Sequence, residues 1–303
     1  MNTFDAFRAT TSRRARGFAT WQPQPETCTL LAHVQTILTE YALYLPLTIR
    51  QIFYRLVGAH GYPKDELAYN RLAEHLNRAR RAKLIDFDAI RDDGFSRSGA
   101  LGYTGRKQFV DALQQDAEAF RLDRQRGQPG RLYVWCEAAG MMPQMQRVAH
   151  PFGIEVLSSG GFDSTSAKHR LAREFAELDL PVQVLHVGDH DPSGIHCFLS
   201  LADDVASFAQ VYGGRVTFER VAVLPEHIEA FNLPTAPPKS TDRRRFTGET
   251  VQAEALPPDR LAALLDEAID SRLNRTIYVR LLHEEARQRA ALVNDFAAFG
   301  KKS

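Results

Sequence analysis

Residues 185–194 read LHVGDHDPSG, and this stretch decides the fold because it places two carboxylates directly after a buried strand. The segment 181–187 is short, apolar and rich in β-branched residues, which is typical of a strand in a parallel sheet. Ligands bind at the carboxyl ends of such strands. Side chains two residues apart in an extended chain point the same way, so we expect Asp189 and Asp191 to converge on one point. The alternative for this motif alone is an aspartate-rich turn that caps the next helix.

A second acidic strand end lies earlier in the chain. The apolar run 131–136 has the composition of another buried strand and stops at Glu137. A third strand is predicted at 153–157, between the other two. Right-handed crossovers place such strands side by side with their carboxyl ends together. The segments 144–149 and 166–177 have helical composition and supply the crossovers.

These strand ends predict one acidic site. Glu137, Asp189 and Asp191 offer only oxygen ligands, which suit Mg²⁺ or, in its place, Mn²⁺. A divalent cation would also remove the repulsion between the two aspartates. The alternation along the turn points its central histidine away from the carboxylates, which disfavours a zinc site. The histidines that such a zinc site would use are His186, His190 and His196.

A strand-end glutamate followed two strands later by Asp-X-Asp resembles a Toprim domain, the metal-binding module of topoisomerases, primases and some nucleases. The form Asp-X-Asp-Pro-X-Gly is most similar to the A subunit of topoisomerase VI and to its relative, the meiotic double-strand-break protein. The turn 160–165 is similar to the glycine-rich loop of those proteins, although it lacks their usual proline. The resemblance implies an α/β fold with a Rossmann-like, mainly parallel sheet.

The first third of the chain carries a second motif of the same family. Those proteins have a winged-helix domain with a helix that reads roughly Arg-Asp-Ile-Phe-Tyr, and its tyrosine cleaves DNA. Residues 50–54 read RQIFY, with Gln51 in place of the acidic residue. Arg50 and Tyr54 are one helical turn apart and share a face of the predicted helix. The resemblance implies that Tyr54 is the nucleophile, with Arg50 and Glu137 as further catalytic residues; the alternative for Tyr54 is a core aromatic.

Charge and helical pattern support a DNA-binding first part. The first 110 residues hold 16 Lys or Arg against 10 Asp or Glu, whereas the remainder holds 22 against 27. Amphipathic helices are predicted at 27–41, 48–57 and 68–83, followed by short strands at 84–87 and 89–91. This is winged-helix order, in which the third helix is offered to DNA. The residues of that helix that we expect to contact DNA are Arg71, Arg78, Arg81 and Lys83.

The length and composition allow two modest domains. The chain has 303 residues, of which 44% are hydrophobic. It contains no apolar run of about 18 residues, and its three cysteines are widely separated, so we expect a cytoplasmic, nucleoid-associated protein without membrane contact. The predicted domains are a winged-helix DNA-binding and cleavage domain at 1–93, a linker and helix at 94–130, and a Toprim domain with a C-terminal extension at 131–303.

The resemblance implies a Mg²⁺-dependent enzyme that cleaves double-stranded DNA and leaves a 5′-phosphotyrosyl link. It also implies a homodimer and a separate ATPase subunit of the GHKL type, since no Walker-type phosphate loop is present. Two alternatives remain open at this stage: a Toprim nuclease that uses water as the nucleophile, and a DNA-binding adaptor without catalysis. Glu254 lies in a segment similar to the closing part of the family, and the sequence leaves open whether it approaches the metal site.

Overall fold

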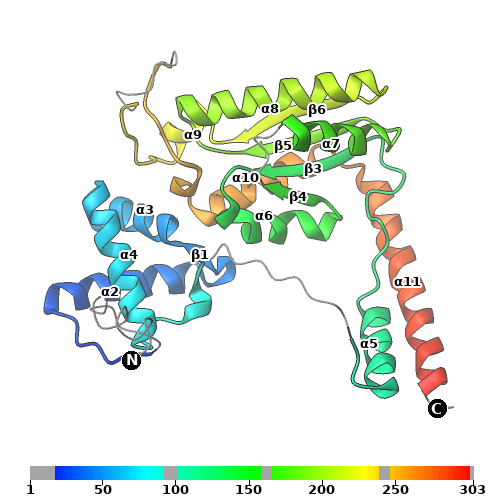
Figure 1. Cartoon of the computed structure of the whole chain (residues 1–303), viewed down its shortest axis with the longest axis horizontal. Helices are drawn as coiled ribbons and strands as arrows, with labels where there is room; N and C mark the ends of the chain where they lie inside the picture. Colours follow the sequence, from blue (N-terminus) through cyan, green and yellow to red (C-terminus); the bar gives the residue numbers. More distant parts are fainter. Residues whose placement is uncertain (1–17, 92–101, 159–164, 239–245, 301–303) are drawn as a thin grey trace, which may run out of the picture.

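A computed structural model describes residues 18–91, 102–158, 165–238 and 246–300 of the chain (Figure 1). Within these residues the protein is a mixed α/β structure with one four-stranded, all-parallel sheet and ten α-helices. The glycine-rich turn at 160–164 and most of the predicted linker lie outside the described residues. No helix in the described part of the chain is long and apolar enough to cross a membrane.

The four strands run in the order β4-β3-β5-β6. They are β3 (Arg131–Cys136), β4 (Glu155–Ser158), β5 (Val182–Val187) and β6 (Val216–Ala222). In β3, Cys136 lies opposite both Ser158 and Val187, so these three strands end level with one another. The parallel sheet and its common carboxyl edge are therefore as predicted.

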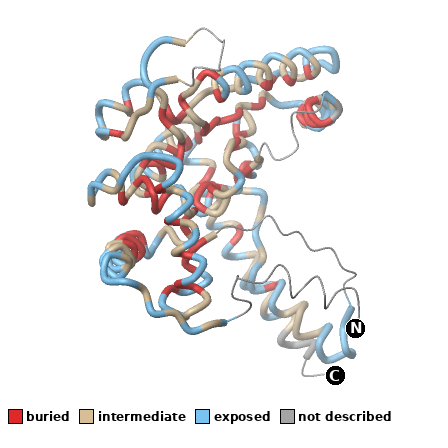
Figure 2. Tube along the Cα trace, turned by 60° about the vertical axis from the view of Figure 1, so that its left-hand side comes forward, coloured by how far each residue is buried: buried red, intermediate tan, exposed pale blue. Residues whose placement is uncertain are grey.

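Helices cover both faces of the sheet (Figure 1). On one face, α7 (Thr165–Ala176) and α8 (Pro192–Val211) enclose a core that includes Trp135. On the other face, α6 (Met142–Ala149) and α10 (Pro258–Asp270) pack over the neighbouring Val134. Successive side chains of a strand point to opposite faces, so one strand supplies both cores. Figure 2 shows the buried residues concentrated along the strands and the inner sides of these helices.

The first part of the chain holds three helices: α2 (Pro25–Glu40), α3 (Ile49–His60) and α4 (Glu66–Arg81). These are the three helices that the sequence predicts. Leu72 and Leu76 of α4 are fully buried, and both belong to the same hydrophobic cluster as the α6–α10 face of the sheet. The three helices and that face of the sheet therefore share one continuous core.

The predicted β-wing is wrong. Phe87–Ala89 is a 3₁₀ helix instead of a strand. Ile90–Arg91 (β2) is a strand, as predicted, but it pairs in parallel with Leu47–Thr48 (β1), so residues 84–91 form no hairpin. Asp86 explains the difference, because its side chain accepts a hydrogen bond from the backbone N–H of Asp88 at 3.0 Å. Such a local bond satisfies the backbone in a turn and competes with strand pairing.

Two helices leave the body of the protein side by side. They are α5 (Arg106–Glu118) and α11 (Arg275–Gly300), which extend away from the sheet in Figure 1 and carry few buried residues along their outer part in Figure 2. The sequence predicts α5 but not α11. The short helix α9 (Pro225–Ala230) follows β6 and was also not predicted.

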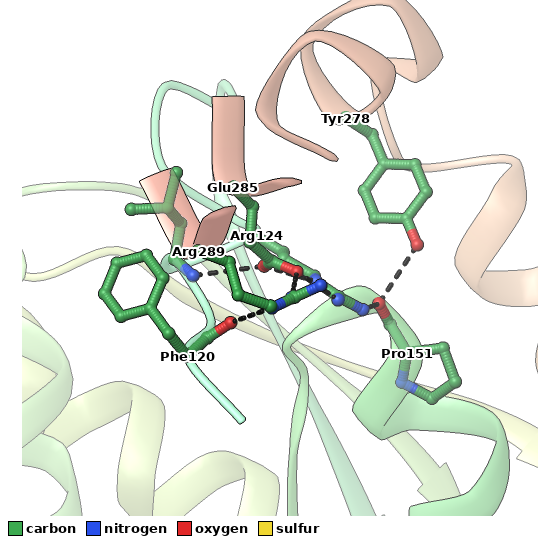
Figure 3. A network of polar contacts seen from close by, with 7 residues as sticks. Phe120, Arg124, Pro151, Tyr278, Glu285 and Arg289 are labelled. Atoms are coloured by element: carbon green, nitrogen blue, oxygen red, sulfur yellow. Dashed lines mark hydrogen bonds and ion pairs between the residues drawn. The ribbon is translucent and has the colours of Figure 1, made fainter. Parts of the chain in front are cut away.

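A buried carboxylate joins this pair of helices to the sheet (Figure 3). Glu285 of α11 is 2% exposed and accepts hydrogen bonds from Arg124 at 2.7 and 3.0 Å and from the Leu122 N–H at 3.0 Å. Arg289 pairs with the same carboxylate and also donates to the Phe120 carbonyl. The hydrogen bonds from Arg124, and then those from Leu122 and Arg289, lower the pKa of Glu285 to about 2.

This network predicts a pH-dependent loss of stability in Glu285→Gln. A depressed pKa stabilises the fold above the pKa of an unfolded glutamate, and this contribution disappears as the pH falls towards 2. At pH 7 we expect the free energy of unfolding to fall by roughly 2 kcal/mol, because Arg124 and Arg289 lose a charged partner. Urea denaturation from pH 7 to pH 3 measures the difference, which should shrink as the pH falls.

Glu284→Gln is the matched control for this prediction. Glu284 is the neighbouring residue and pairs with Arg126 at 2.6 Å at a more exposed position. Exposed ion pairs contribute little, so this variant should lose much less stability. Equal losses in the two variants, or a difference that does not depend on pH, would contradict the role of Glu285.

Candidate active site at the carboxyl edge of the sheet

The end of β3 brings Glu137 against the turn that follows β5. The Glu137 N–H donates to the Val187 carbonyl at 2.9 Å, and the Glu137 carboxylate accepts from the Asp189 N–H at 3.0 Å. Gly188 lies between them with no room for a side chain. A Cβ at that position would stand 2.5 Å from His186 Cε1 and closer still to Glu137 Oε2. The glycine therefore permits the contact between the two strand ends.

The two aspartates of the turn are each oriented by a backbone N–H. Asp189 Oδ1 accepts from Ala253 N at 2.7 Å, and Asp191 Oδ1 accepts from Gly194 N at 2.7 Å. Asp191 is thus the N-cap of α8, as the alternative interpretation of the motif predicts. The N-cap bond uses one of the two carboxylate oxygens, so capping and ligand binding are compatible in this residue.

The acidic residues lie close enough to perturb one another. Burial raises the pKa of Asp189, and the nearby Asp191 raises it further. Burial likewise raises the pKa of Glu137, with Asp189 adding to the effect. The carboxylates are therefore destabilised in their charged form, which is the condition that a bound cation relieves.

A partly buried arginine binds the backbone of the turn. Arg220 of β6 donates to the carbonyls of Gly188, at 2.9 Å, and of Asp189, and also to that of Val223 at 3.2 Å. Glu137, Asp189 and Asp191 all act on the guanidinium electrostatically. The sequence analysis missed Arg220, because nothing in a strand pattern distinguishes an arginine that points towards a distant turn.

The fit of a metal depends on the donor atoms. Among the described residues, no group of three or more His, Cys, Asp or Glu side chains could by itself hold a metal ion. Glu137, Asp189 and Asp191 nevertheless present an oxygen-only set, in which the pKa values of Glu137 and Asp189 are raised. Mg²⁺ is usually held by one or two carboxylates, with water and phosphate completing its shell. The residues therefore fit a Mg²⁺ ion that is bound partly by these carboxylates and partly by the substrate. They do not fit an ion that is enclosed by protein ligands alone.

The three histidines of the zinc alternative form no such group either. His186 is buried against Phe198, with ring centroids 4.7 Å apart, and burial, followed by Arg220, lowers its pKa to about 3. His190 pairs through its backbone with Val251 and packs its ring against Phe246. Both histidines are thus held by packing and backbone contacts, which is typical of structural residues.

A five-residue segment connects the acidic turn to α3. We call residues 251–255 the clasp; its first residue forms a two-bond antiparallel bridge with His190, at 2.7 and 2.9 Å. The Ala253 N–H then binds Asp189, and the Gln252 side chain accepts a hydrogen bond from the Tyr54 hydroxyl at 2.7 Å. The structure therefore links Tyr54 and Asp189 through two neighbouring residues.

Glu254 of the clasp reaches Arg50. Glu254 Oε2 lies 4.0 Å from Arg50 Nη1, and the Glu254 side chain is 8% exposed. Burial raises the pKa of Glu254 to about 7, while the Arg50 guanidinium opposes this shift. The acidic cluster therefore has a fourth member, which the sequence analysis left open, and the cation that pairs with it is the arginine of the RQIFY motif.

The start of α3 explains the change from the acidic residue to Gln51. Thr48 caps the helix by accepting from Gln51 N at 3.1 Å, and the Gln51 side chain accepts from Thr48 N at 2.8 Å. The same side chain donates to Gln144 Oε1 of α6 at 2.8 Å. A carboxylate could close the cap but could not donate to Gln144, so the amide fits both roles.

Tyr54 itself is buried. Its residue is 8% exposed, its ring packs against Phe53 with centroids 5.4 Å apart, and Lys64 Nζ lies 6.0 Å from its ring centroid. Burial raises its pKa to about 12, although Arg50 on the same helix face opposes the shift. Arg50 and Tyr54 both belong to α3 and lie four residues apart, so they share one face of the helix as predicted.

The basic residues of α4 lie on or near its solvent side. Arg71, Arg78 and Lys83 are exposed, and Arg81 is partly exposed. Arg78 pairs with Glu74, and Arg81 donates to Asn77 at 2.8 Å. The predicted DNA-contacting residues are thus available to a ligand, and whether they bind DNA stays a prediction.

No protein-family model matches the chain, and no curated protein matches it significantly.

The close packing at Gly188 predicts that Gly188→Ala disrupts the acidic edge. The added methyl group would displace Glu137 or His186, and overpacking of this kind costs about 1–3 kcal/mol. Thermal and urea denaturation measure the loss. Gly58→Ala is the control, because that position lies inside α3 with nothing within 4 Å of a Cβ and should be neutral or slightly stabilised. Equal stability of the two variants would contradict the packing described here.

Proposed function

We propose that this protein is a Mg²⁺-dependent DNA-cleaving enzyme that resembles the A subunit of type IIB topoisomerases, with Tyr54 as its nucleophile. The observation that carries the proposal is the link from Tyr54 through Gln252 and Ala253 to Asp189. Two motifs that are 135 residues apart in the chain, and that were predicted separately, thereby meet at one edge of the sheet.

In the proposed reaction the Tyr54 oxygen forms a bond to phosphorus and the bond to the 3′ oxygen breaks. The protein is left joined to a DNA 5′ end. The phenol proton passes to water as the new bond forms, and the leaving 3′ oxygen takes up a proton from water to become a hydroxyl. Glu137, Asp189 and Asp191 would hold Mg²⁺, which supplies positive charge to the phosphate when bound. Arg50 lies beside Tyr54 and adds a second positive charge for the same purpose.

The wider assembly follows from the resemblance. A double-strand break needs two tyrosines, so we propose a homodimer that binds double-stranded DNA through Arg71, Arg78, Arg81 and Lys83 of each copy. A separate ATPase subunit of the GHKL type would drive strand passage if breaks are resealed. In the family the tyrosine works with the acidic site of the other protomer, whereas here the Tyr54 hydroxyl bonds to its own chain.

One observation favours a second candidate function. Tyr54 is 8% exposed and its pKa is about 12, so its hydroxyl is a poor nucleophile in this conformation. A metal-dependent nuclease that activates water at the same acidic edge needs no reactive tyrosine. The test below separates the two functions.

Tyr54→Phe removes the oxygen and keeps the ring. We expect this variant to fold, with a loss of about 1 kcal/mol for its hydrogen bond to Gln252, and to bind DNA normally. It should form no covalent protein–DNA adduct when reactions with Mg²⁺ or Mn²⁺ are stopped with SDS. Adduct formation by the wild-type chain is the measurement.

Tyr62→Phe is the matched control, since Tyr62 also lies in the first part of the chain and donates one hydrogen bond, to the Ala68 carbonyl. It should form the adduct like the wild type. Metal-dependent cleavage without an adduct in the wild type, retained in Tyr54→Phe, would replace the transesterase by the water-using nuclease.

The metal site is tested by Asp189→Asn combined with Asp191→Asn. Asparagine keeps the acceptors for Ala253 and Gly194 and removes only the charge. We expect cleavage to be lost, Mn²⁺ affinity measured by calorimetry to fall more than about tenfold, and stability without metal to be unchanged or higher. Asp203→Asn, an exposed site on α8, is the control. Wild-type cleavage and Mn²⁺ affinity in the double variant would refute this site.

A further inference from the structure

A basic cavity lies along α6, beside the segments that lead into β3 and β4. Its volume is about 400 Å³, within the range of pockets that bind small molecules. Its lining follows α6 from Pro143 in the first turn to Arg147 in the last and continues to Pro151. Eight residues of helix span about 12 Å. The residues that line the cavity are Arg121, Arg124, Pro143, Gln146, Arg147, His150 and Pro151.

One side of this cavity is fixed by the network in Figure 3. Arg124 is held by two hydrogen bonds to Glu285 and by one to the Pro151 carbonyl. Its side chain is 14% exposed, and its charge is balanced by Glu285. Arg124 therefore gives the cavity a rigid wall, and the excess positive charge comes from other residues.

That excess comes from Arg121 and Arg147, which are both exposed. Arg147 donates one hydrogen bond, to the Leu45 carbonyl at 2.7 Å. Within the described parts of the chain, no acidic side chain pairs with the guanidinium of Arg121 or of Arg147. The Arg121 side chain also makes no hydrogen bond to these residues. Two positive charges thus line the cavity without a counter-ion from the described residues.

Helix capping is the structural alternative. Both α5 and α6 end near the cavity, and basic residues stabilise the negative ends of helices. This accounts for Arg289, which donates to the Phe120 carbonyl just after α5, and for Arg124, which donates to the Pro151 carbonyl just after α6. Arg147 also lies in the last turn of α6, where the helix dipole favours its charge, but its hydrogen bond goes to Leu45, which belongs to neither helix. Arg121 donates to no carbonyl of either helix within the described residues, so capping leaves its position unexplained.

We infer that this cavity binds a phosphate group through Arg121 and Arg147, beside the rigid wall formed by Arg124 and Glu285. Arginine is the side chain best suited to phosphate, since its planar fork donates two parallel hydrogen bonds. The group belongs either to a free polyphosphate or to a nucleic-acid backbone. The inference does not rest on the proposed cleavage reaction, because the cavity shares no lining residue with the acidic site or with Tyr54.

Pyrophosphate is the probe for a free ligand, with the full chain and Arg121→Gln combined with Arg147→Gln. We expect the double variant to bind pyrophosphate about tenfold more weakly for each arginine lost, measured by calorimetry. Arg170→Gln combined with Arg173→Gln on α7 removes the same charge from the opposite face of the sheet and should bind like the wild type. If the double variant is unstable, Arg121→Gln alone serves instead, because the Arg121 side chain makes no hydrogen bond or ion pair with the described residues.

Measuring the binding of a DNA duplex at several salt concentrations tests whether the phosphate group in the cavity belongs to a nucleic-acid backbone. A lost phosphate contact lowers the slope of log affinity against log salt by about 0.9. A weaker pyrophosphate complex with an unchanged slope assigns the cavity to a free phosphate, and a lower slope assigns it to nucleic acid. The inference is wrong if two results hold together in the wild type, in the variant with Arg121→Gln and Arg147→Gln, and in the control with Arg170→Gln and Arg173→Gln. These results are an equal affinity for pyrophosphate and an equal salt slope. Tyr54→Phe should leave both measurements unchanged, so this outcome is separate from the fate of the cleavage proposal.

Discussion

The candidate site depends on the contact between the clasp, residues 251–255, and the aspartate turn after β5. Two backbone hydrogen bonds join His190 to the clasp, and a third runs from Ala253 to Asp189. These bonds fix the position of the residues on either side of Ala253. One is Gln252, which meets the Tyr54 hydroxyl, and the other is Glu254, which meets Arg50. The approach of α3 to the acidic edge therefore rests on a short segment that consists of one bridge residue, Gln252 and a single turn of 3₁₀ helix, Ala253–Ala255.

The sequence predicted the parts of the fold that are encoded locally. The strand Arg131–Cys136 has the predicted bounds, since a buried parallel strand is a continuous apolar run with a polar stop. The helix with Arg50 and Tyr54 is set by its cap residue Thr48. The meeting of the acidic residues at one edge of the sheet followed from the right-handed crossovers that connect parallel strands. By contrast, the wing failed because one side chain, Asp86, favoured a turn.

The parts that could not be predicted depend on contacts between distant residues. Gln252 lies 198 positions after the tyrosine it binds, and Ala253 lies 64 positions after its aspartate. No periodicity or spacing marks such pairs. Arg220 could not be identified from the sequence either, because an arginine on a strand suggests an exposed side chain until the turn that it binds is known. The charge balance of the chain also conceals the basic cavity, whose arginines belong to the net-negative part of the sequence.

Burial of Tyr54 is compatible with a structural role and with a reactive one, and the electrostatic surroundings of its hydroxyl bear on both. A pKa of about 12 means that forming the phenolate at pH 7 costs on the order of 7 kcal/mol in this conformation. A tyrosine that only fills a core needs no nearby cation to offset that cost. Tyr54 instead has Arg50 on its own helix face, and Arg50 is paired at 4.0 Å with Glu254, which is itself poorly stabilised as an anion. A phosphate that engaged Arg50 would compete with this weak pair, and it would bring its phosphorus to the side of α3 on which the Tyr54 hydroxyl lies.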